Sequence, residues 1–310
     1  MTILFCSAVD DAEAYRRAMA DRLPETAFRV HPDVGPPEEI RHVLVWRPPA
    51  GLLRSLPNLR GVFNLGAGVD GILATGDDLP EGVPVIRLAD AGMAPQMVEW
   101  MLHGVLRFHR RFDDYARAQA AGRWERLSVP PASDVRVGLM GLGVLGGAVA
   151  EALLARGYSV RGWSRRPKDL PGVTVFHGAD GLSDFLAGTD ILICLLPLTD
   201  ETRGILNADT LGRLPQGAAV LNAARGAHLV DADLLALLDA GHLRGAQLDV
   251  FEPEPLPPDH PFWTHPKVRL TPHIAAVTVV EPSCDQIADT IRRLERGEAP
   301  PNRVDRDAGY

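Results

Sequence analysis

The sequence contains few cysteines, few aromatic residues, no long apolar run and no excess of positive charge. Its three cysteines, Cys6, Cys194 and Cys284, are far apart and form no CxxC pair, so neither a disulfide framework nor a zinc site is indicated. The longest apolar segment, residues 191–196, is far too short to cross a membrane. The sequence therefore predicts neither a bound metal nor a membrane partner.

Acidic residues outnumber basic ones, 40 to 32, which gives a formal net charge of −8. Nucleic acids and anionic membranes bind to basic faces, so neither is an expected partner. Small molecules are expected instead, and an acidic protein that binds small anions needs local positive charge at its site. The first residues contain no basic segment followed by an apolar stretch, so no signal peptide is expected and the predicted location is the cytoplasm.

At 310 residues the chain is long enough for two domains that each bury a core. Short β-like runs alternate with helical or turn-rich segments, and the pattern restarts after the polar stretch 122–134. The clearest runs are residues 3–5, 42–46, 61–65, 83–88, 135–140, 159–163, 190–195, 218–222, 246–250 and 268–270. This alternation predicts an α/β protein with doubly wound parallel sheets.

Residues 93–115 form a long segment with apolar residues at helical spacing. The apolar positions are Met97, Met101, Val105, Phe108 and Phe112. A helix of this length can bridge two domains or form a dimer face, and it can equally be a core helix. Residues 281–296 also predict a helix, with interleaved acidic and basic residues on one solvated side.

A glycine motif with the spacing GxGxxG lies between a predicted strand and a predicted helix. The motif is Gly141-Leu142-Gly143-Val144-Leu145-Gly146. The first glycine permits a tight turn, the second lets the backbone approach a pyrophosphate, and the third permits close packing of helix on strand. The pattern alone is weak in a chain with 30 glycines, but the strand before it and the helix after it predict a dinucleotide site.

The end of the next strand decides which dinucleotide is preferred. NAD enzymes usually place Asp or Glu there to bind the ribose 2′-hydroxyl. Here the residues are Trp163, Ser164, Arg165 and Arg166, and a hydroxyl with two guanidinium groups suits a 2′-phosphate. The prediction is NADPH, and the alternative is a pair of solvent-facing arginines on a turn.

Three residues that each follow a predicted strand can form a catalytic unit: Arg225, Glu254 and His273. Ligands of open α/β sheets bind at the carboxyl ends of the strands, so these residues can converge although they are distant in sequence. Reduction of a 2-oxo acid needs a cation for the carboxylate, a proton donor for the carbonyl oxygen and a group that keeps that donor protonated. Arg, His and Glu meet these needs in turn.

Several blocks, in this order, resemble the D-isomer-specific 2-hydroxyacid dehydrogenase family over nearly the whole chain. They are Gly66-Ala67-Gly68-Val69-Asp70, the glycine motif, Leu196-Pro197-Leu198-Thr199 with Glu201-Thr202, Ala224-Arg225-Gly226, Leu248-Asp249-Val250 through Glu254-Pro255, and Thr271-Pro272-His273. Further blocks are similar to the bacterial glyoxylate/hydroxypyruvate reductase branch of that family. These are Val45-Trp46-Arg47-Pro48-Pro49, Arg110-Arg111-Phe112-Asp113-Asp114-Tyr115, Trp163-Ser164-Arg165, Asp305-Arg306 and Gly309-Tyr310.

The resemblance implies roles for these residues. His273 would be the general acid, Glu254 would hydrogen-bond its imidazole, and Arg225 would orient the substrate through its carboxylate and carbonyl oxygen. The N–H groups of Ala67, Gly68 and Val69 would bind the carboxylate, although the loop alone equally indicates a strand-ending turn. Trp46 and Arg47 would line the substrate site, although Trp46 can equally be a core residue. Besides the three glycines, Ser164, Arg165 and Arg166, the implied cofactor contacts are Val144, Leu145, Leu196, Pro197, Ala223, Ala224, Asp249, His273 and Ala275.

The resemblance also implies an arrangement and an activity. Residues 1–97 with 280–310 would form a discontinuous substrate-binding domain, residues 98–279 a cofactor domain, both Rossmann-like or flavodoxin-like, with a cleft between them. The protein would be a homodimer that reduces glyoxylate or hydroxypyruvate with NADPH, with NADH as the alternative cofactor. Two other functions stay open: reduction of a different or larger 2-oxo acid, and a non-catalytic dinucleotide-sensing protein.

Overall fold

The computed structural model describes residues 1–309, and Tyr310 of the terminal motif lies outside them. The chain divides into two compact units. Unit 1 consists of Met1–Met93 and residues 277–309, and unit 2 is Ala94–Ala276. The division thus falls a few residues before each of the predicted boundaries at 97/98 and 279/280.

Unit 1 is built on a five-stranded parallel sheet with the order β2-β1-β3-β4-β5. The strands are β1 (Thr2–Cys6), β2 (Ala27–Val30), β3 (Ile40–Val45), β4 (Gly61–Asn64) and β5 (Val85–Arg87), and the helices are α1 (Ala12–Arg22), α2 (Asp70–Leu73) and α9 (Val280–Glu295). All five residues of β1 are buried, as expected for a parallel strand that is covered on both faces. Asp11 caps α1 by accepting hydrogen bonds from the N–H groups of Glu13 and Ala14.

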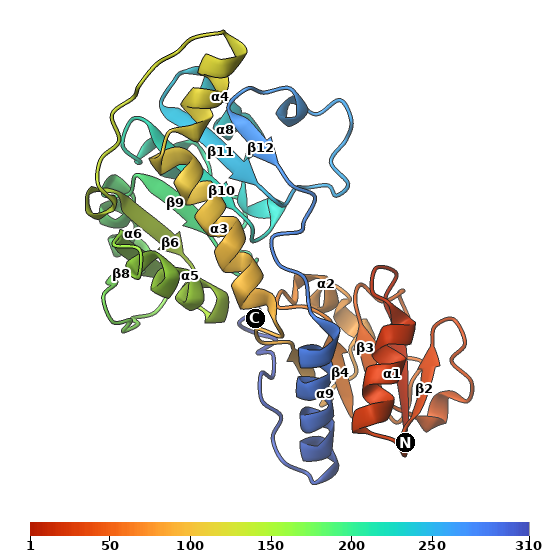
Figure 1. Cartoon of the computed structure of the whole chain (residues 1–310). Helices are drawn as coiled ribbons and strands as arrows, with labels where there is room; N and C mark the ends of the chain where they lie inside the picture. Colours follow the sequence, from red (N-terminus) through yellow and green to blue (C-terminus); the bar gives the residue numbers. More distant parts are fainter. Residues whose placement is uncertain (310) are drawn as a thin grey trace. The chain divides into compact units, whose positions relative to one another are not determined.

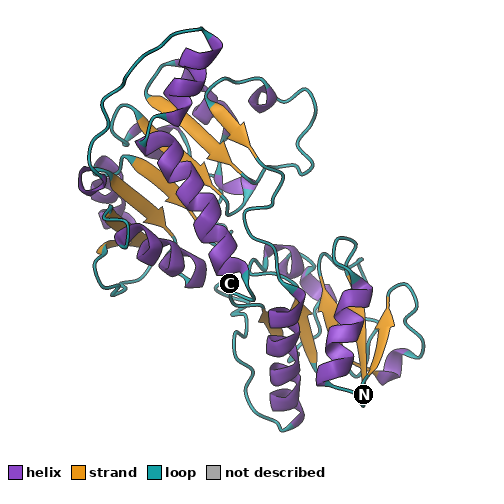
Figure 2. Cartoon of the chain, in the orientation of Figure 1, coloured by secondary structure: helices purple, strands orange, loops and turns teal. Residues whose placement is uncertain are grey.

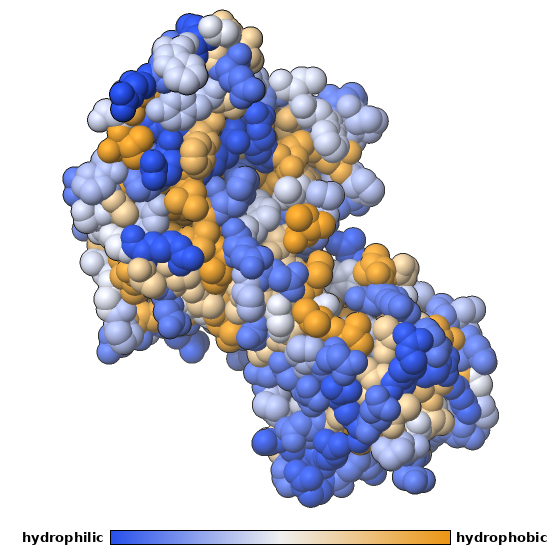
Figure 3. All heavy atoms as spheres, in the orientation of Figure 1, coloured by the Kyte–Doolittle hydropathy of each residue, from blue (hydrophilic) through white to orange (hydrophobic). Residues whose placement is uncertain are grey.

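The C-terminal helix α9 packs beside α1, which lies more than 250 residues earlier in the sequence (Figure 1). The Arg22 guanidinium joins the two helices, with Nη2 2.8 Å from Glu281 Oε2 and Nε 2.7 Å from Asp285 Oδ1. The visible surface over α9 is mostly hydrophilic (Figure 3), while Ile287 and Ile291 on its inner side are buried. The predicted helix with one charged side is therefore present.

Unit 2 contains a seven-stranded parallel sheet with the order β12-β11-β10-β9-β6-β7-β8. Figure 2 draws strands as orange arrows and helices in purple. Its strands are β6 (Arg136–Met140), β7 (Ser159–Ser164), β8 (Thr174–His177), β9 (Ile191–Cys194), β10 (Ala218–Asn222), β11 (Leu243–Leu248) and β12 (Val268–Leu270). Its helices are α3 (Met93–His109), which begins at the boundary, α4 (Phe112–Ala120), α5 (Val144–Leu154), α6 (Gly178–Ala187), α7 (Ala208–Gly212) and α8 (Asp231–Asp239). The predicted α/β class with two parallel sheets is confirmed.

Alternate residues of the central strands of unit 2 supply two separate cores, because successive side chains of a strand point to opposite faces. On one face, Val137 and Ile193 pack with residues of α3 and α5, such as Met101 and Leu153. On the other face, Met140, Leu192 and Val220 belong to a core that includes α6, α7 and α8. The strand order reverses between β6 and β9, the point at which ligands bind in doubly wound sheets.

The segment 93–115 is not one continuous helix. Arg111 adopts a left-handed backbone with φ of 60° and separates α3 from α4. Its Nε lies 2.7 Å from Asp114 Oδ2, so the side chain stabilises the start of α4. The apolar spacing continues across the break, which is why the sequence pattern did not reveal it.

Candidate active site

The three residues predicted to form the catalytic unit lie on neighbouring loops at one edge of the unit 2 sheet. Arg225 follows β10, Glu254 follows β11 and His273 follows β12. These strands are adjacent and parallel, with Asn222 of β10 paired to Leu248 of β11 and Leu248 paired to Leu270 of β12. Their carboxyl ends therefore point to the same edge of the sheet.

His273 and Glu254 form a direct pair. His273 Nδ1 lies 2.9 Å from Glu254 Oε2, and the side chains are 33% and 22% exposed. The second carboxylate oxygen, Oε1, accepts the N–H of Phe251 at 3.0 Å, which fixes the orientation of the carboxylate. Because a carboxylate only accepts, Nδ1 donates to it, and Nε2 is the ring nitrogen that can exchange a proton with a ligand.

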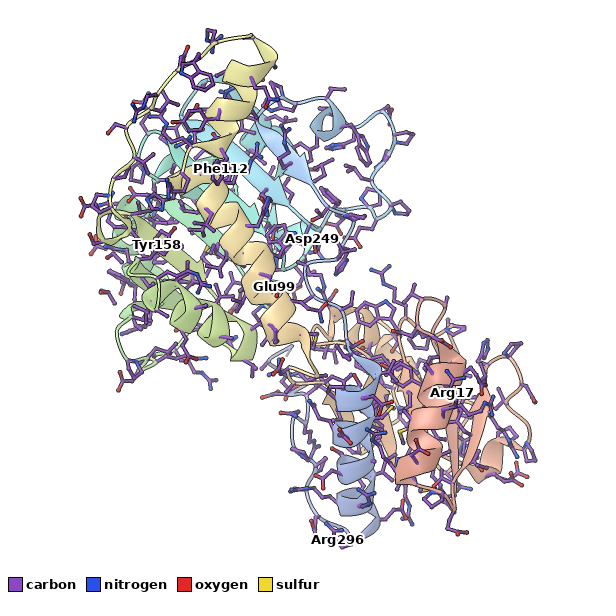
Figure 4. The ribbon with its side chains drawn as sticks, in the orientation of Figure 1. Arg17, Glu99, Phe112, Tyr158, Asp249 and Arg296 are labelled. Carbon is purple, nitrogen blue, oxygen red and sulfur yellow. The ribbon has the colours of Figure 1, made fainter. Side chains whose placement is uncertain are left out.

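Asp249, labelled in Figure 4, organises the loop that carries His273. Its side chain is buried, with Oδ1 accepting from the Thr271 hydroxyl at 2.5 Å and the Ile274 N–H at 2.9 Å, and Oδ2 accepting from the Ala275 N–H at 2.8 Å. The His273 N–H donates to the Asp249 carbonyl at 2.7 Å, and His273 has φ of 56°. Burial raises the pKa of Asp249, and these hydrogen bonds oppose that shift.

The Arg225 loop packs directly against the segment that leads to Glu254. A Cβ atom on Gly226 would lie 2.0 Å from the Phe251 carbonyl carbon, so only glycine permits this approach. Fully buried Asn222 closes the loop, because its Nδ2 donates to the Arg225 carbonyl at 3.0 Å and its Oδ1 accepts from the Ala224 N–H at 3.1 Å. The backbone of Arg225 is thus held from both sides.

The glycine motif forms the turn between β6 and α5. Gly141 has φ of 102°, and a Cβ there would lie 2.5 Å from the Leu195 carbonyl oxygen. A Cβ on Gly146 would lie 2.0 Å from the Gly141 oxygen, which explains the third glycine as a packing requirement. A Cβ on Gly143 would meet no atom within 4 Å. Gly143 caps the N-terminus of α5, so the open space lies where a helix attracts a phosphate.

The end of β7 carries positive charge beside this turn. Ser164 is buried and its hydroxyl donates to the Arg166 carbonyl at 2.7 Å, which shapes the turn that presents Arg165 and Arg166 to solvent. Arg165 Nη1 lies 3.4 Å from Glu201 Oε2. Lys168 Nζ donates to the Leu142 carbonyl at 2.7 Å, which brings a third cation onto the glycine turn. Lys168 was not singled out from the sequence, although its position shortly after the two arginines is a signal.

The substrate-binding residues predicted near the N-terminus lie in unit 1. Buried Asn64, at the end of β4, donates from Nδ2 to the carbonyls of Gly66 and Gly68 at 3.0 and 2.9 Å, which fixes the loop 66–69. A Cβ on Gly66 would lie 2.7 Å from Trp46 Cζ3, so the indole packs on this loop. Arg47 is exposed, and its Cζ lies 5.9 Å from the centre of the Trp46 ring. Asn64 was not singled out from the sequence, although Asn before a Gly-rich turn is a signal.

Neither metal ligation nor a membrane span is found in residues 1–309. In this part of the chain, no group of three or more His, Cys, Asp or Glu side chains is placed to hold a metal ion. None of its helices combines the length and the apolar character that crossing a membrane requires.

The strand order, the glycine turn and the polar residues at the same sheet edge define a dinucleotide-dependent oxidoreductase. Residues 102–275 match the family model described as D-isomer specific 2-hydroxyacid dehydrogenase, NAD binding domain. The chain belongs to the D-isomer-specific 2-hydroxyacid dehydrogenase family and is an NAD(P)-dependent enzyme. The family resemblance seen in the sequence blocks is confirmed.

Curated relatives and solved structures cover the whole chain. Glyoxylate/hydroxypyruvate reductase A of Serratia proteamaculans is 47% identical over 100% of both chains, and that of Photorhabdus laumondii is 45% identical, also over 100% of both. A D-isomer-specific 2-hydroxyacid dehydrogenase from Xanthobacter autotrophicus, solved with NADPH and MES, has a TM-score of 0.96 and 45% identity, covering 100% of this chain and 99% of that one. The NADPH-dependent glyoxylate/hydroxypyruvate reductase of Sinorhizobium meliloti, solved with NADP and sulfate, has a TM-score of 0.92 and 37% identity over 100% of both chains.

Proposed function

We propose that this enzyme reduces glyoxylate and hydroxypyruvate to the corresponding 2-hydroxy acids with NADPH. The observation that carries the proposal is the His273–Glu254 pair, 2.9 Å apart, at the sheet edge where Arg225 also lies. Proteins that are 47% and 45% identical over their full length bear the name glyoxylate/hydroxypyruvate reductase A, which supports this substrate class.

The residues at the glycine turn fit NADPH better than NADH. The space at Gly143 and the start of α5 suit a pyrophosphate, and residues 163–168 contain no carboxylate that would repel a 2′-phosphate. Arg165, Arg166 and Lys168 supply three cations in its place, and the Ser164 hydroxyl holds the turn that carries the arginines. The preferred cofactor is NADPH.

The reduction adds a hydride to the carbonyl carbon of the substrate and a proton to its oxygen. The bound nicotinamide supplies the hydride. The planar guanidinium of Arg225 binds the carboxylate and the carbonyl oxygen of the substrate, since it can donate to two oxygens at once. His273 donates the proton from Nε2, and Glu254 stabilises the protonated imidazole through the Nδ1–H bond.

The loop 66–69 is proposed to bind the substrate carboxylate through the N–H groups of Ala67, Gly68 and Val69. Asn64 supports this role because it engages the carbonyls of Gly66 and Gly68, so the loop has one fixed conformation. The indole of Trp46 packs on the loop, and a bulky neighbour favours a two- or three-carbon acid.

We also propose that the enzyme is a homodimer. Large apolar side chains on and after the helices α3 and α4 are exposed in the single chain: Leu106 by 37%, Phe112 by 54% and Trp124 by 98%. Such side chains are frequent at interfaces between protein chains. Sedimentation of the wild type and of Trp124→Ser tests this, since a homodimer held by this surface should be weakened by the substitution. The cytoplasmic location stays a prediction.

The function is tested by following NADPH oxidation with glyoxylate, hydroxypyruvate, pyruvate and a bulky 2-oxo acid side by side. The proposal expects the highest kcat/KM for glyoxylate or hydroxypyruvate. A preference for the bulky acid would assign a different 2-oxo acid, and no turnover with any of them would favour a dinucleotide-sensing protein.

A further inference from the structure

His228 is a fully buried histidine that touches the backbone of Arg225. It ends the short 3-10 turn Gly226–His228, which begins directly after Arg225, and its relative exposure is 0%. Its Nδ1 lies 3.2 Å from the backbone nitrogen of Arg225, and its Nε2 lies 3.2 Å from the Pro197 carbonyl oxygen. One imidazole thus connects the loop after β10 with the loop after β9.

The hydrogen-bond partners determine which ring nitrogen carries the proton. The Arg225 N–H can only donate, so Nδ1 must be bare, and the Pro197 carbonyl can only accept, so Nε2 must carry hydrogen. Nδ1 also lies 3.2 Å from the Arg225 oxygen, but that oxygen already accepts from Asn222 and from the His228 N–H. A proton on Nδ1 instead of Nε2 would leave Nε2 and the Pro197 oxygen facing each other as two acceptors. The neutral form protonated on Nε2 therefore satisfies the site.

Other hydrogen bonds also join the two loops, and further ones hold Pro197 and Arg225 within their own loops. The N–H groups of Gly204 and Leu206 donate to the carbonyls of Ala227 and His228 at 2.8 Å each. The Thr202 hydroxyl donates to the Pro197 carbonyl at 2.7 Å, beside the bond from Nε2. The His228 ring adds the tie between Pro197 and Arg225 themselves.

We propose that His228 is a positioning residue that couples the cofactor-side loop at Pro197 to the substrate-binding Arg225. This rests on the proposed function, in which Pro197 lies on the cofactor side and Arg225 binds the 2-oxo acid. With Nδ1 bonded to its N–H, Arg225 keeps the extended backbone, with φ of −143° and ψ of 149°, from which its guanidinium extends. The Nε2 bond holds the Pro197 carbonyl together with the bond from the Thr202 hydroxyl.

Two conservative substitutions separate these bonds. In His228→Asn the amide oxygen takes the place of Nδ1 and can accept from the Arg225 N–H, while the bond to Pro197 is lost. In His228→Gln the amide nitrogen takes the place of Nε2 and can donate to Pro197, while the bond to Arg225 is lost. Leu229→Ala is the matched control, because it removes buried packing from the next residue and leaves His228 intact.

The experiment measures KM and kcat for glyoxylate together with the Kd of NADPH from its fluorescence. Losing one buried hydrogen bond corresponds to a change of about tenfold. His228→Gln should raise the KM for glyoxylate by about that factor and leave the Kd of NADPH within about twofold. His228→Asn should show the reverse pattern. Equal changes in both constants for the two variants, or the same pattern in Leu229→Ala, would overturn the proposal.

A second measurement does not depend on the stability of the variants or on turnover. Nitrogen NMR of wild-type protein labelled in its histidines reports which ring nitrogen of His228 carries the proton. A bare Nδ1 with hydrogen on Nε2 supports the coupling, and hydrogen on Nδ1 contradicts it. If the wild type reduced no 2-oxo acid, the proposed function would fail, while this spectrum and the Kd of NADPH would still test the link.

Discussion

Removing both arginines after β7 should convert the enzyme from one that prefers NADPH into one that uses NADPH and NADH equally well. In Arg165→Ala with Arg166→Ala, two guanidinium groups that face solvent at the glycine turn are lost. A hydrogen bond between charged groups contributes about 1.5–3 kcal/mol. Because both side chains are exposed, we take the lower value for each, and the sum of about 3 kcal/mol corresponds to a loss of about a hundredfold in NADPH affinity.

The loss should fall on NADPH alone, since NADH has no 2′-phosphate. The pair of Arg165 with Glu201 spans 3.4 Å with 39% and 70% of the side chains exposed, so breaking it costs less than about 1 kcal/mol of folding stability. The same pair makes Glu201 a competitor of the phosphate, and Glu201→Gln should therefore tighten NADPH binding by a few-fold.

Initial rates with either cofactor at a fixed glyoxylate concentration, and cofactor Kd values from fluorescence, measure the preference. Arg213→Ala is the matched control, because Arg213 is 41% exposed and pairs with Asp209 on α7 of the same unit. An unchanged ratio of the NADPH and NADH constants in the double variant would refute the assignment of the phosphate site. Equal weakening of both cofactors would point to a general distortion of the turn.

Other substitutions test the catalytic pair, its support and one buried histidine of unit 1. His273→Gln removes the proposed proton donor, so kcat should fall by about a hundredfold or more while the Kd of NADPH stays near the wild-type value; undiminished reduction would remove His273 from that role. Asp249→Asn places an amide N–H against a backbone or hydroxyl donor of the loop 271–275. The free energy of unfolding should therefore drop by about 1–3 kcal/mol, and kcat/KM should fall as well. An unchanged melting temperature would contradict these hydrogen bonds. Burial lowers the pKa of His42 to about 4, against 6.5 in the unfolded chain, and the bond to Glu295 opposes the shift only partly. Between these values the unfolded chain binds a proton that the folded chain does not, so stability should decrease by about 2 kcal/mol from pH 8 to pH 5; urea unfolding should show this dependence in the wild type and lose it in His42→Asn.

Local patterns made the fold and the main site residues predictable. The glycine motif, the strand before it and the helix after it lie within twenty residues. The tight turn, the approach of the pyrophosphate and the packing of helix on strand therefore all depend on residues that are close in sequence. Arg225, Glu254 and His273 were singled out because each follows a predicted strand, and parallel strands end at a common edge.

The residues that escaped prediction act through contacts that sequence spacing does not encode. Lys168 binds a carbonyl 26 residues earlier in the chain, and His228 binds one 31 residues earlier. The break at Arg111 was hidden for a different reason, since the apolar period of the helix continues through it and only the backbone dihedral changes. Such features become visible once the strands have placed their loops side by side.

Buried polar side chains at or after the ends of β10 and β11 hold the loops after β10 and β12. Asn222, His228 and Asp249 are each at most 1% exposed. The first two bind backbone groups of the loop after β10, and Asp249 binds backbone N–H groups of the loop after β12. A buried polar group costs free energy unless its hydrogen bonds are formed, and these bonds form in only one loop geometry. Apolar residues of similar size could preserve the fold, but they would not specify that loop geometry. Directional hydrogen bonds leave the backbone a smaller range of positions than apolar contacts do. Proton and hydride transfer require such precise positions of the reacting groups. We therefore expect substitutions at these three positions to impair turnover more than stability, in contrast to substitutions of the neighbouring leucines.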